Sequence, residues 1–131
     1  MNEQQRATLV ETWLTKSDSA LRDARLLKEN GSLSACVNRL YYAAFYAVSA
    51  VLASRNQSYG KHSAVRAAVH RDFVKTGLLS KEHGRTYDIL LSRREQADYQ
   101  PAVTFEPDEV HEYFVHAREM VAALKGLAAQ Q

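Results

Sequence analysis

The segment 33–54 constrains the fold more than any other part of this sequence. It contains a single charged residue, Arg39, in a run that is otherwise mostly apolar. At the helical period its apolar side chains form two stripes, one around Leu40 and one around Tyr42. A helix that is apolar on nearly all sides must be enclosed by other elements. We therefore expect this helix to pack on its own bundle with one face and on a second copy of the chain with the other.

Four more helices are predicted around this segment. The chain has only 5 Gly and 2 Pro, which favours long helices and disfavours a β fold with many turns. Apolar residues recur near the helical period between capping or breaking residues, namely Asn30-Gly31, Gly77, Ser80 and Pro107. The expected helices are 4–29, 33–54, 62–76, 81–98 and 107–124, with Gly126 ending the last one. The predicted fold class is all-α, an up-and-down helical bundle of four main helices plus a shorter fifth.

The length of 131 residues fits one domain, so we expect a single helical domain over 1–131. One cysteine, Cys36, excludes an internal disulfide framework and favours a reducing compartment. No apolar run reaches the ~20 residues of a membrane span, and the first residues do not resemble a signal peptide. We expect a cytoplasmic protein with no membrane partner. Neither the histidine spacing nor the single cysteine suits a metal site, so we expect no metal and no cofactor.

The formal charge of +2 hides a strong asymmetry along the chain. Residues 54–94 carry nine basic and three acidic side chains, whereas residues 95–131 carry two basic and seven acidic ones. The basic stretch could meet phosphates, or it could lie against the acidic stretch within the fold. We expect the fold to neutralise part of this charge and to leave a local basic site around Arg94.

Arg39 is the first candidate for a functional residue. A guanidinium in so apolar a helix needs a partner or a path to water. Tyr42 and Tyr46 follow it at i+3 and i+7, on the same side of the predicted helix. One interpretation is a pocket in which the arginine and the phenols hold a phosphate. The alternative is an arginine paired with a carboxylate across a helix pair or a dimer seam.

The segment from Arg93 to Tyr99 holds the second group of candidate site residues. Arg94 and Asp98 stand four residues apart, so they share a helix face and can pair. We expect Tyr99 to leave the helix and fold back towards Arg94, which would make a corner suited to an anion or a nucleic-acid backbone. The alternative is a solvated ion pair, which contributes only ~0.3–0.5 kcal/mol.

The third group is Gly60-Lys61-His62, at the start of the predicted helix 62–76. Backbone N–H groups at a helix start, together with Lys61 and His62, could bind a phosphate. The alternative is a histidine that is merely on the surface.

These three blocks together resemble the HEPN domain (higher eukaryotes and prokaryotes nucleotide-binding), in particular its small stand-alone prokaryotic branch. The blocks are Asn38-Arg39-Leu40-Tyr41-Tyr42-Ala43-Ala44-Phe45, Gly60-Lys61-His62, and Arg94 with Asp98-Tyr99. The resemblance implies a helical bundle that dimerises. It also implies a ribonuclease acting as a toxin or defence effector, and a minimal nucleotidyltransferase as antitoxin partner.

The sequence departs from the ribonuclease motif of that family, in which an arginine is followed after four to six residues by a histidine. Tyr99 stands where the histidine would be, and the next histidine is His111. Tyrosine, with an ordinary pKa near ~10, is a poor proton acceptor at neutral pH. The resemblance therefore implies the fold and the dimer more firmly than it implies catalysis.

We carry three functional hypotheses forward. The first is a toxin-like effector that binds RNA or nucleotides at a dimer cleft and cleaves RNA without a metal. The second is a non-catalytic module that binds a nucleotidyltransferase partner or a nucleotide, and the third is a structural dimer. The resemblance implies catalytic roles for Arg94, Asp98 and Tyr99. Together with the charge pattern it implies binding roles for Arg39, Tyr42, Lys61, His62 and Arg93.

Overall fold

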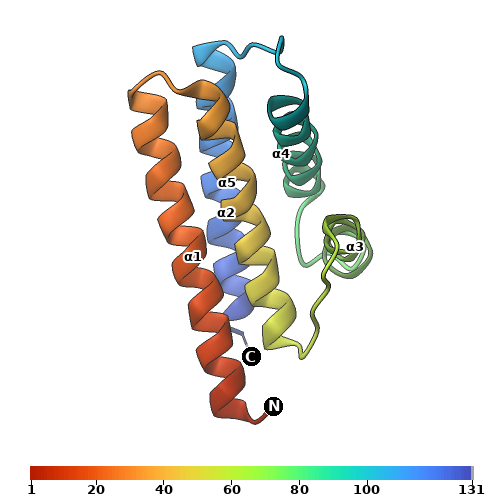
Figure 1. Ribbon diagram of the computed structural model, residues 1–131. Helices are drawn as coiled ribbons and strands as arrows, with labels where there is room; N and C mark the ends of the chain where they lie inside the picture. The colour runs from red at the N-terminus through yellow and green to blue at the C-terminus, as the bar shows by residue number, and fades with distance from the viewer. Residues whose placement is uncertain (131) are drawn as a thin grey trace.

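A computed structural model describes residues 1–130, and these residues form helices and connections without a strand. The helices are α1 (Glu3–Glu29), α2 (Leu33–Ser54), α3 (His62–Ala68), α4 (Lys81–Tyr99) and α5 (Pro107–Ala128), with a π-helical turn, η1 (Val69–Val74), directly after α3. The four long helices run alternately up and down, and both ends of the described chain lie at the same end of the bundle (Figure 1). The predicted all-α, up-and-down bundle is confirmed.

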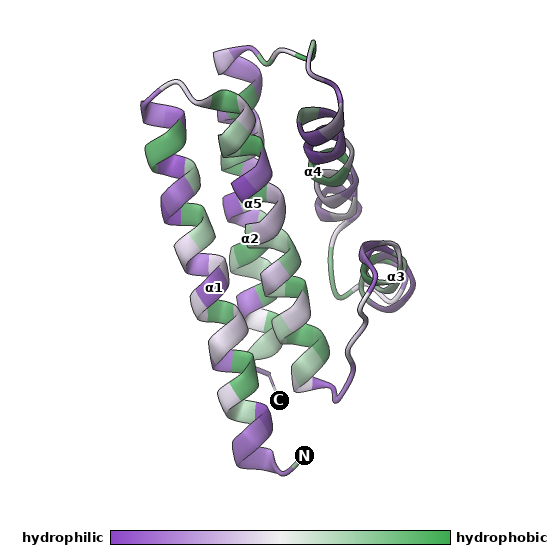
Figure 2. Ribbon diagram, viewed as in Figure 1, coloured by the Kyte–Doolittle hydropathy of each residue, from purple (hydrophilic) through white to green (hydrophobic). Residues whose placement is uncertain are grey.

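Helix α2 is the centre of the molecule, as its composition predicts. It packs against α1, α4 and α5, and the largest enclosed side chains of the protein include its Leu40, Tyr41 and Leu52. In Figure 2 α2 is mostly green and pale, whereas α1 carries purple along its length. The close approach of α1 to α2 is marked by Ser17, a buried residue whose hydroxyl donates a hydrogen bond to the carbonyl of Ala43 at 2.7 Å.

One face of α2 is left only half-buried. It carries Tyr42, Phe45, Tyr46 and Ser49, which follow the i, i+3, i+4, i+7 spacing of a single helix face. The rings on this face touch one another, and Tyr46 stacks on Trp13 of α1 with 5.8 Å between ring centroids. Helix α2 also passes, by length and composition, as a helix able to cross a membrane, but most of it lies inside the bundle.

Most predicted helix boundaries are confirmed. Gly31 and Gly77 adopt φ values of 78° and 83°, the left-handed conformation that ends a helix at little cost when the residue is glycine. The Ser80 hydroxyl accepts a hydrogen bond from the backbone N–H of His83 and caps α4. Pro107 stands in the first turn of α5, where its missing N–H is not needed.

Helix α1 begins at Glu3, one residue earlier than predicted, and three further predictions of helix extent were wrong. The last helix continues through Gly126 to Ala128, because a glycine inside a helix costs only ~1 kcal/mol and the following turn still buries Ala128. Helix α4 runs one residue further than predicted and includes Tyr99. The segment 62–76 splits into α3 and η1; the wider π turn keeps both Val69 and Phe73 inside the core.

Candidate functional site

Arg94 lies at the seam between α4 and α2. Its guanidinium sits over the rings of Tyr41 and Tyr42, with 5.0 and 5.8 Å to the ring centroids, and its side chain is only 12% exposed. The Nη1 atom donates a hydrogen bond to the Asp98 carboxylate at 3.2 Å, as the i, i+4 spacing predicts. The Nε atom is buried and has no hydrogen-bond partner among the described residues. A guanidinium carries five N–H donors, and here Nη2 remains available to an anion, whereas the enclosed Nε does not.

Two side chains of α2 complete the polar part of this seam. Asn38 donates a long hydrogen bond of 3.5 Å to Asp98, and its carbonyl oxygen accepts bonds from Nε and Nη2 of Arg39 at 3.1 and 3.0 Å. The Arg39 guanidinium lies over the Tyr42 ring at 5.1 Å. Within residues 1–130 Arg39 therefore meets an amide and a ring, and no carboxylate of a neighbouring helix pairs with it. Arg94 and Arg39 thus share one aromatic neighbour, Tyr42.

A hollow opens beside these groups, between the ends of α1, α2 and α4. Its lining includes Asn38, Arg39 and Asp98 together with Leu27 and Ser34. The polar part of the seam is thus open to a ligand from outside, while Arg94 is held behind it against the tyrosines.

His62, the first residue of α3, joins the seam from a third helix. Its Nδ1 is 2.6 Å from the hydroxyl of Tyr41, and that hydroxyl is 3.4 Å from the hydroxyl of Tyr87 on α4. The imidazole stacks on Phe45 with 4.6 Å between ring centroids. Burial first, and then the positive charge of Arg94, lowers the pKa of His62 below its ordinary value. We call Asn38, Arg39, Tyr42, His62, Arg94 and Asp98 the Arg94 cluster.

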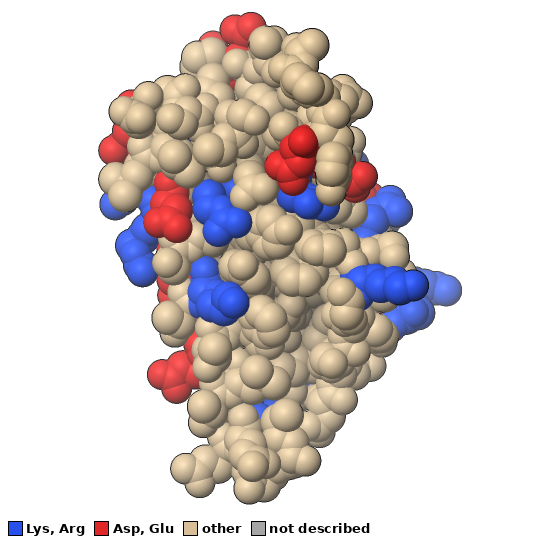
Figure 3. Space-filling model, viewed as in Figure 1, with Lys and Arg blue, Asp and Glu red and all other residues tan. Residues whose placement is uncertain are grey.

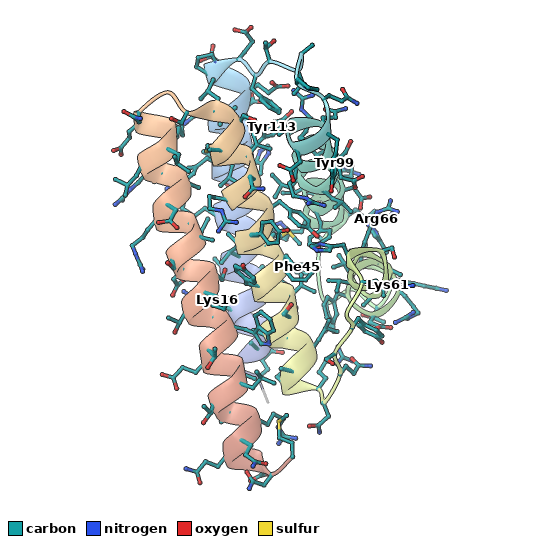
Figure 4. All side chains as sticks on the ribbon, viewed as in Figure 1. Lys16, Phe45, Lys61, Arg66, Tyr99 and Tyr113 are labelled. Carbon is teal, nitrogen blue, oxygen red and sulfur yellow. The ribbon has the colours of Figure 1, made fainter. Side chains whose placement is uncertain are left out.

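Three of the predicted site residues lie elsewhere. Arg93 faces α5, where its Nη2 donates to both carboxylate oxygens of Glu109 at 3.1 Å and its guanidinium covers the ring of Phe105 at 4.5 Å. Tyr99 stays helical and 76% exposed, and it lines a separate hollow between α3 and α4. Figure 4 shows Lys61 at the outer end of α3; Lys61 is exposed and precedes the helix directly. All three are next to a member of the Arg94 cluster in the chain, but Arg93 and Tyr99 point away from it.

A model of the HEPN domain matches residues 10–127 of this chain. The chain belongs to the HEPN domain family. It is 40% identical over 127 residues to a Thermotoga maritima protein named UPF0332 protein, covering 97% of this chain and 95% of that one. It is 28% identical over 107 residues to a Methanocaldococcus jannaschii protein named "Putative toxin MJ0142", covering 82% of this chain and 72% of that one.

The HEPN fold is also seen in a solved structure. The crystal structure of TT1696 from Thermus thermophilus superposes with a TM-score of 0.76 at 18% identity, over 90% of this chain and 97% of that one. A likeness at such low identity concerns the fold alone.

Two residues of this HEPN site were missed by sequence reasoning. Tyr41 and Tyr87 fall on apolar helix faces and were assigned to the core, where both indeed lie fully enclosed. The signal that could have found them is their hydroxyl groups, because a buried tyrosine normally requires a hydrogen-bond partner. Cys36 lies in the core, and burial raises the pKa of its thiol to about 11, which makes the thiol unreactive.

The charge of the HEPN chain is partly neutralised within the fold, as predicted. Five of the nine basic residues in 54–94 form ion pairs, and two of these, Arg93 and Arg94, pair with carboxylates of the acidic stretch 95–131. Figure 3 shows blue basic groups on both sides of a tan strip down the middle of the visible face. Within residues 1–130 no three His, Cys, Asp or Glu side chains gather as a metal ion would require.

Proposed function

We propose that this HEPN protein is a toxin-like effector that binds single-stranded RNA through the Arg94 cluster. The observation that carries the proposal is the state of Arg94: its side chain is 12% exposed, its Nη1 donates to Asp98, and its Nη2 donates to no described residue and is not enclosed by them. A phosphate would supply acceptors for the Nη donors in the geometry that arginine prefers. Arg39 and Lys61 add positive charge nearby, and Tyr42 adds a ring on which a base can stack.

The test of binding compares two arginines of the same helix. Arg94→Ala removes the proposed phosphate contact, whereas Arg85→Ala removes an exposed arginine that pairs with Glu82 in the preceding turn. A charge-assisted hydrogen bond contributes ~1.5–3 kcal/mol, so we expect Arg94→Ala to weaken binding of a labelled single-stranded RNA by about 10- to 100-fold. Arg85→Ala should change it by less than about threefold. Equal losses in both variants, or an affinity that does not fall with added salt, would contradict the proposal.

We also propose that the cluster cleaves RNA by attack of the ribose 2′-OH on the adjacent phosphate. Asp98 accepts the 2′-OH proton, the O2′–P bond forms and the P–O5′ bond breaks. The leaving O5′ takes a proton from water and Asp98 returns its proton to water, which leaves a 2′,3′-cyclic phosphate and a 5′-OH. Arg94 holds the phosphate oxygens as charge develops on them. In the presence of a chelator, Asp98→Asn should abolish cleavage and retain binding, and a 2′-deoxy substitution at the scissile position should protect the RNA.

The alternative is a non-catalytic module that binds a nucleotidyltransferase partner or a nucleotide. The exposed position of Tyr99, away from Arg94, favours it, because the position of the family's motif histidine then supplies no proton acceptor to the cluster. Binding without cleavage by the wild-type protein would select this alternative and reject the cleavage step.

We further propose that the protein acts as a homodimer through the half-buried face of α2. Phe45, Tyr46 and Ser49 lie on that face next to the Arg94 cluster, so a second copy would bring two clusters to one seam. Tyr46→Glu places a charge on the face and should convert a dimer into a monomer in sedimentation velocity experiments. A wild-type protein that is monomeric at micromolar concentration would contradict this arrangement.

A further inference from the structure

Three helices contribute to a short chain of hydrogen-bonding groups beneath the Arg94 cluster. Tyr87 comes from α4, Tyr41 from α2 and His62 from α3. The hydroxyls of Tyr87 and Tyr41 are 3.4 Å apart, and the hydroxyl of Tyr41 is 2.6 Å from Nδ1 of His62. Both tyrosines are fully enclosed, so neither hydroxyl can turn to water instead.

The direction of the chain follows from the number of hydrogens. Each hydroxyl has one hydrogen to donate, and Tyr87 has no hydrogen-bond partner other than Tyr41 among residues 1–130. The hydrogen of Tyr87 must therefore point to Tyr41, because the opposite direction leaves it unpaired in the core. Tyr41 in turn donates to Nδ1 of His62. An imidazole whose Nδ1 accepts in this way is neutral and carries its hydrogen on Nε2.

The other ring nitrogen of His62 is open to the outside. Nε2 has no hydrogen-bond partner among the described residues. It is also absent from the buried atoms that lack a partner, so solvent or a ligand can reach it. Since Nδ1 faces inward to Tyr41, Nε2 lies on the outer edge of the ring. Stacking on Phe45 at 4.6 Å and an edge contact with Tyr42 at 5.9 Å fix the plane of the imidazole.

Arg94 and His62 both lie against the ring of Tyr41. The guanidinium of Arg94 lies 5.0 Å from the centroid of the Tyr41 ring, and the imidazole of His62 lies 5.6 Å from that centroid. A phosphodiester group that reaches both would accept from the guanidinium with one oxygen and from the imidazole N–H with another.

We propose that His62 is a neutral hydrogen-bond donor that holds a phosphodiester oxygen beside Arg94, and that Tyr87 and Tyr41 fix it in this form. The role rests on the RNA binding proposed above. It makes His62 a binding residue and not the proton acceptor of the cleavage step, because the lone pair of its ring is already occupied by Tyr41. Asp98 then remains the carboxylate available for that step.

Protonation of His62 is opposed from every side but one. A protonated Nδ1 would donate to Tyr41, so the Tyr41 hydroxyl would have to donate to Tyr87 instead. The hydrogen of the Tyr87 hydroxyl would then have no acceptor. Arg94 on α4 and the adjacent Lys61 are positive, Tyr42 of α2 offers only its ring, and burial acts in the same direction. Glu95 of α4 alone favours the charged form. The neutral donor form therefore persists to lower pH than in an ordinary histidine.

The first test uses the free protein and does not depend on RNA. Long-range ¹H–¹⁵N spectra of the histidine rings report the tautomer and the charge directly. We expect the Nε2–H form of His62, still neutral at pH 6.5. A hydrogen on Nδ1, or a charged ring at pH 6.5, would overturn the proposal even if RNA binding is confirmed.

The second test measures RNA affinity in variants of His62. The amide nitrogen of Gln reaches about as far as Nε2, whereas that of Asn reaches only as far as Nδ1. We expect His62→Ala and His62→Asn to lose about fivefold in affinity and His62→Gln to stay near the wild type. At constant salt the wild type and His62→Gln should show the same dependence of affinity on pH, because the other histidines are common to both. A glutamine variant as weak as the alanine variant, or a wild-type affinity that rises on acidification more steeply than that of His62→Gln, contradicts the proposal.

The two tests separate the failure of this proposal from that of the proposed function. A wild-type protein that does not bind RNA refutes the proposed function and the role of His62 in it together. The spectra then still decide whether the two tyrosines hold the imidazole neutral. Circular dichroism of each variant shows that its helices are intact.

Discussion

Removing the hydroxyl of Tyr41 should cost more stability than removing the hydroxyl of Tyr87, although both belong to one hydrogen-bonded chain. Tyr41→Phe breaks the 2.6 Å contact with His62 and also takes away the acceptor of the enclosed Tyr87 hydroxyl. Tyr87→Phe breaks only the 3.4 Å contact and leaves Tyr41 donating to His62. The double variant Tyr41→Phe/Tyr87→Phe removes both hydroxyls, so no hydroxyl is left without a partner in the core.

The magnitudes follow from the burial of each group. A hydrogen bond contributes about 0.5–1.5 kcal/mol net, and a buried polar group left unpaired costs about 1–3 kcal/mol. His62 is half-buried, so water can replace part of the hydrogen bond that it loses. We therefore take the contribution of the Tyr41–His62 hydrogen bond from the lower end of the ~0.5–1.5 kcal/mol range. We expect a loss of about 2–3 kcal/mol for Tyr41→Phe and of about 0.5–1 kcal/mol for Tyr87→Phe. The double variant should lose less than Tyr41→Phe alone, which is a favourable coupling between the two changes.

The assay is urea unfolding followed by far-UV circular dichroism at one fixed protein concentration, because association would shift the midpoint. For a chain of this length, about 2–3 kcal/mol corresponds to a fall in Tm on the order of 10 °C. In the Tyr41→Phe variant the pKa of His62 should also rise relative to the wild type, since the neutral ring loses the bond that favours it. Equal losses in the two single variants, or strictly additive losses in the double variant, would refute the assigned direction of the chain.

Two further predictions concern helix α4 and its neighbours. Burial acts to raise the pKa of Asp88, but hydrogen bonds, the strongest from Arg66 at 2.7 Å, hold it below its ordinary value. The stability this carboxylate contributes is therefore present above its unfolded pKa of ~3.9 and lost as the pH falls through the folded value. The gap in unfolding free energy between wild type and Asp88→Asn, about 1 kcal/mol at pH 7, should narrow steadily as the pH falls below about 4; a gap independent of pH refutes this. Gly84→Ala would place a Cβ 3.0 Å from Cγ2 of Val74, so overpacking should outweigh the helix gain and lower stability by about 1 kcal/mol. Gly126→Ala meets nothing within 4 Å and should raise stability by about 0.5–1 kcal/mol, and the opposite order of the two variants in thermal unfolding would contradict the packing.

The sequence by itself determined the features that depend on neighbours along the chain. Apolar periodicity located the helices, and capping or breaking residues placed most of their ends. The lack of charge in 33–54 identified the central helix. The pairing of Arg94 with Asp98 followed from the i, i+4 geometry of a single helix, which needs no knowledge of the rest of the fold. The failure at Gly126 has the same origin, since a local helix-breaking preference of ~1 kcal/mol is smaller than the packing that continues α5.

Only the tertiary structure decided which residues form the site. Arg93 and Arg94 are adjacent and chemically alike, but successive residues on a helix point about 100° apart. The packing of α4 turns one towards Glu109 of α5 and the other towards Tyr41 and Tyr42 of α2. In the same way, only packing brings His62 to the α2–α4 seam, across 21 residues from Tyr41. Periodicity gives the face of each helix, but which faces meet depends on contacts between residues far apart in the chain.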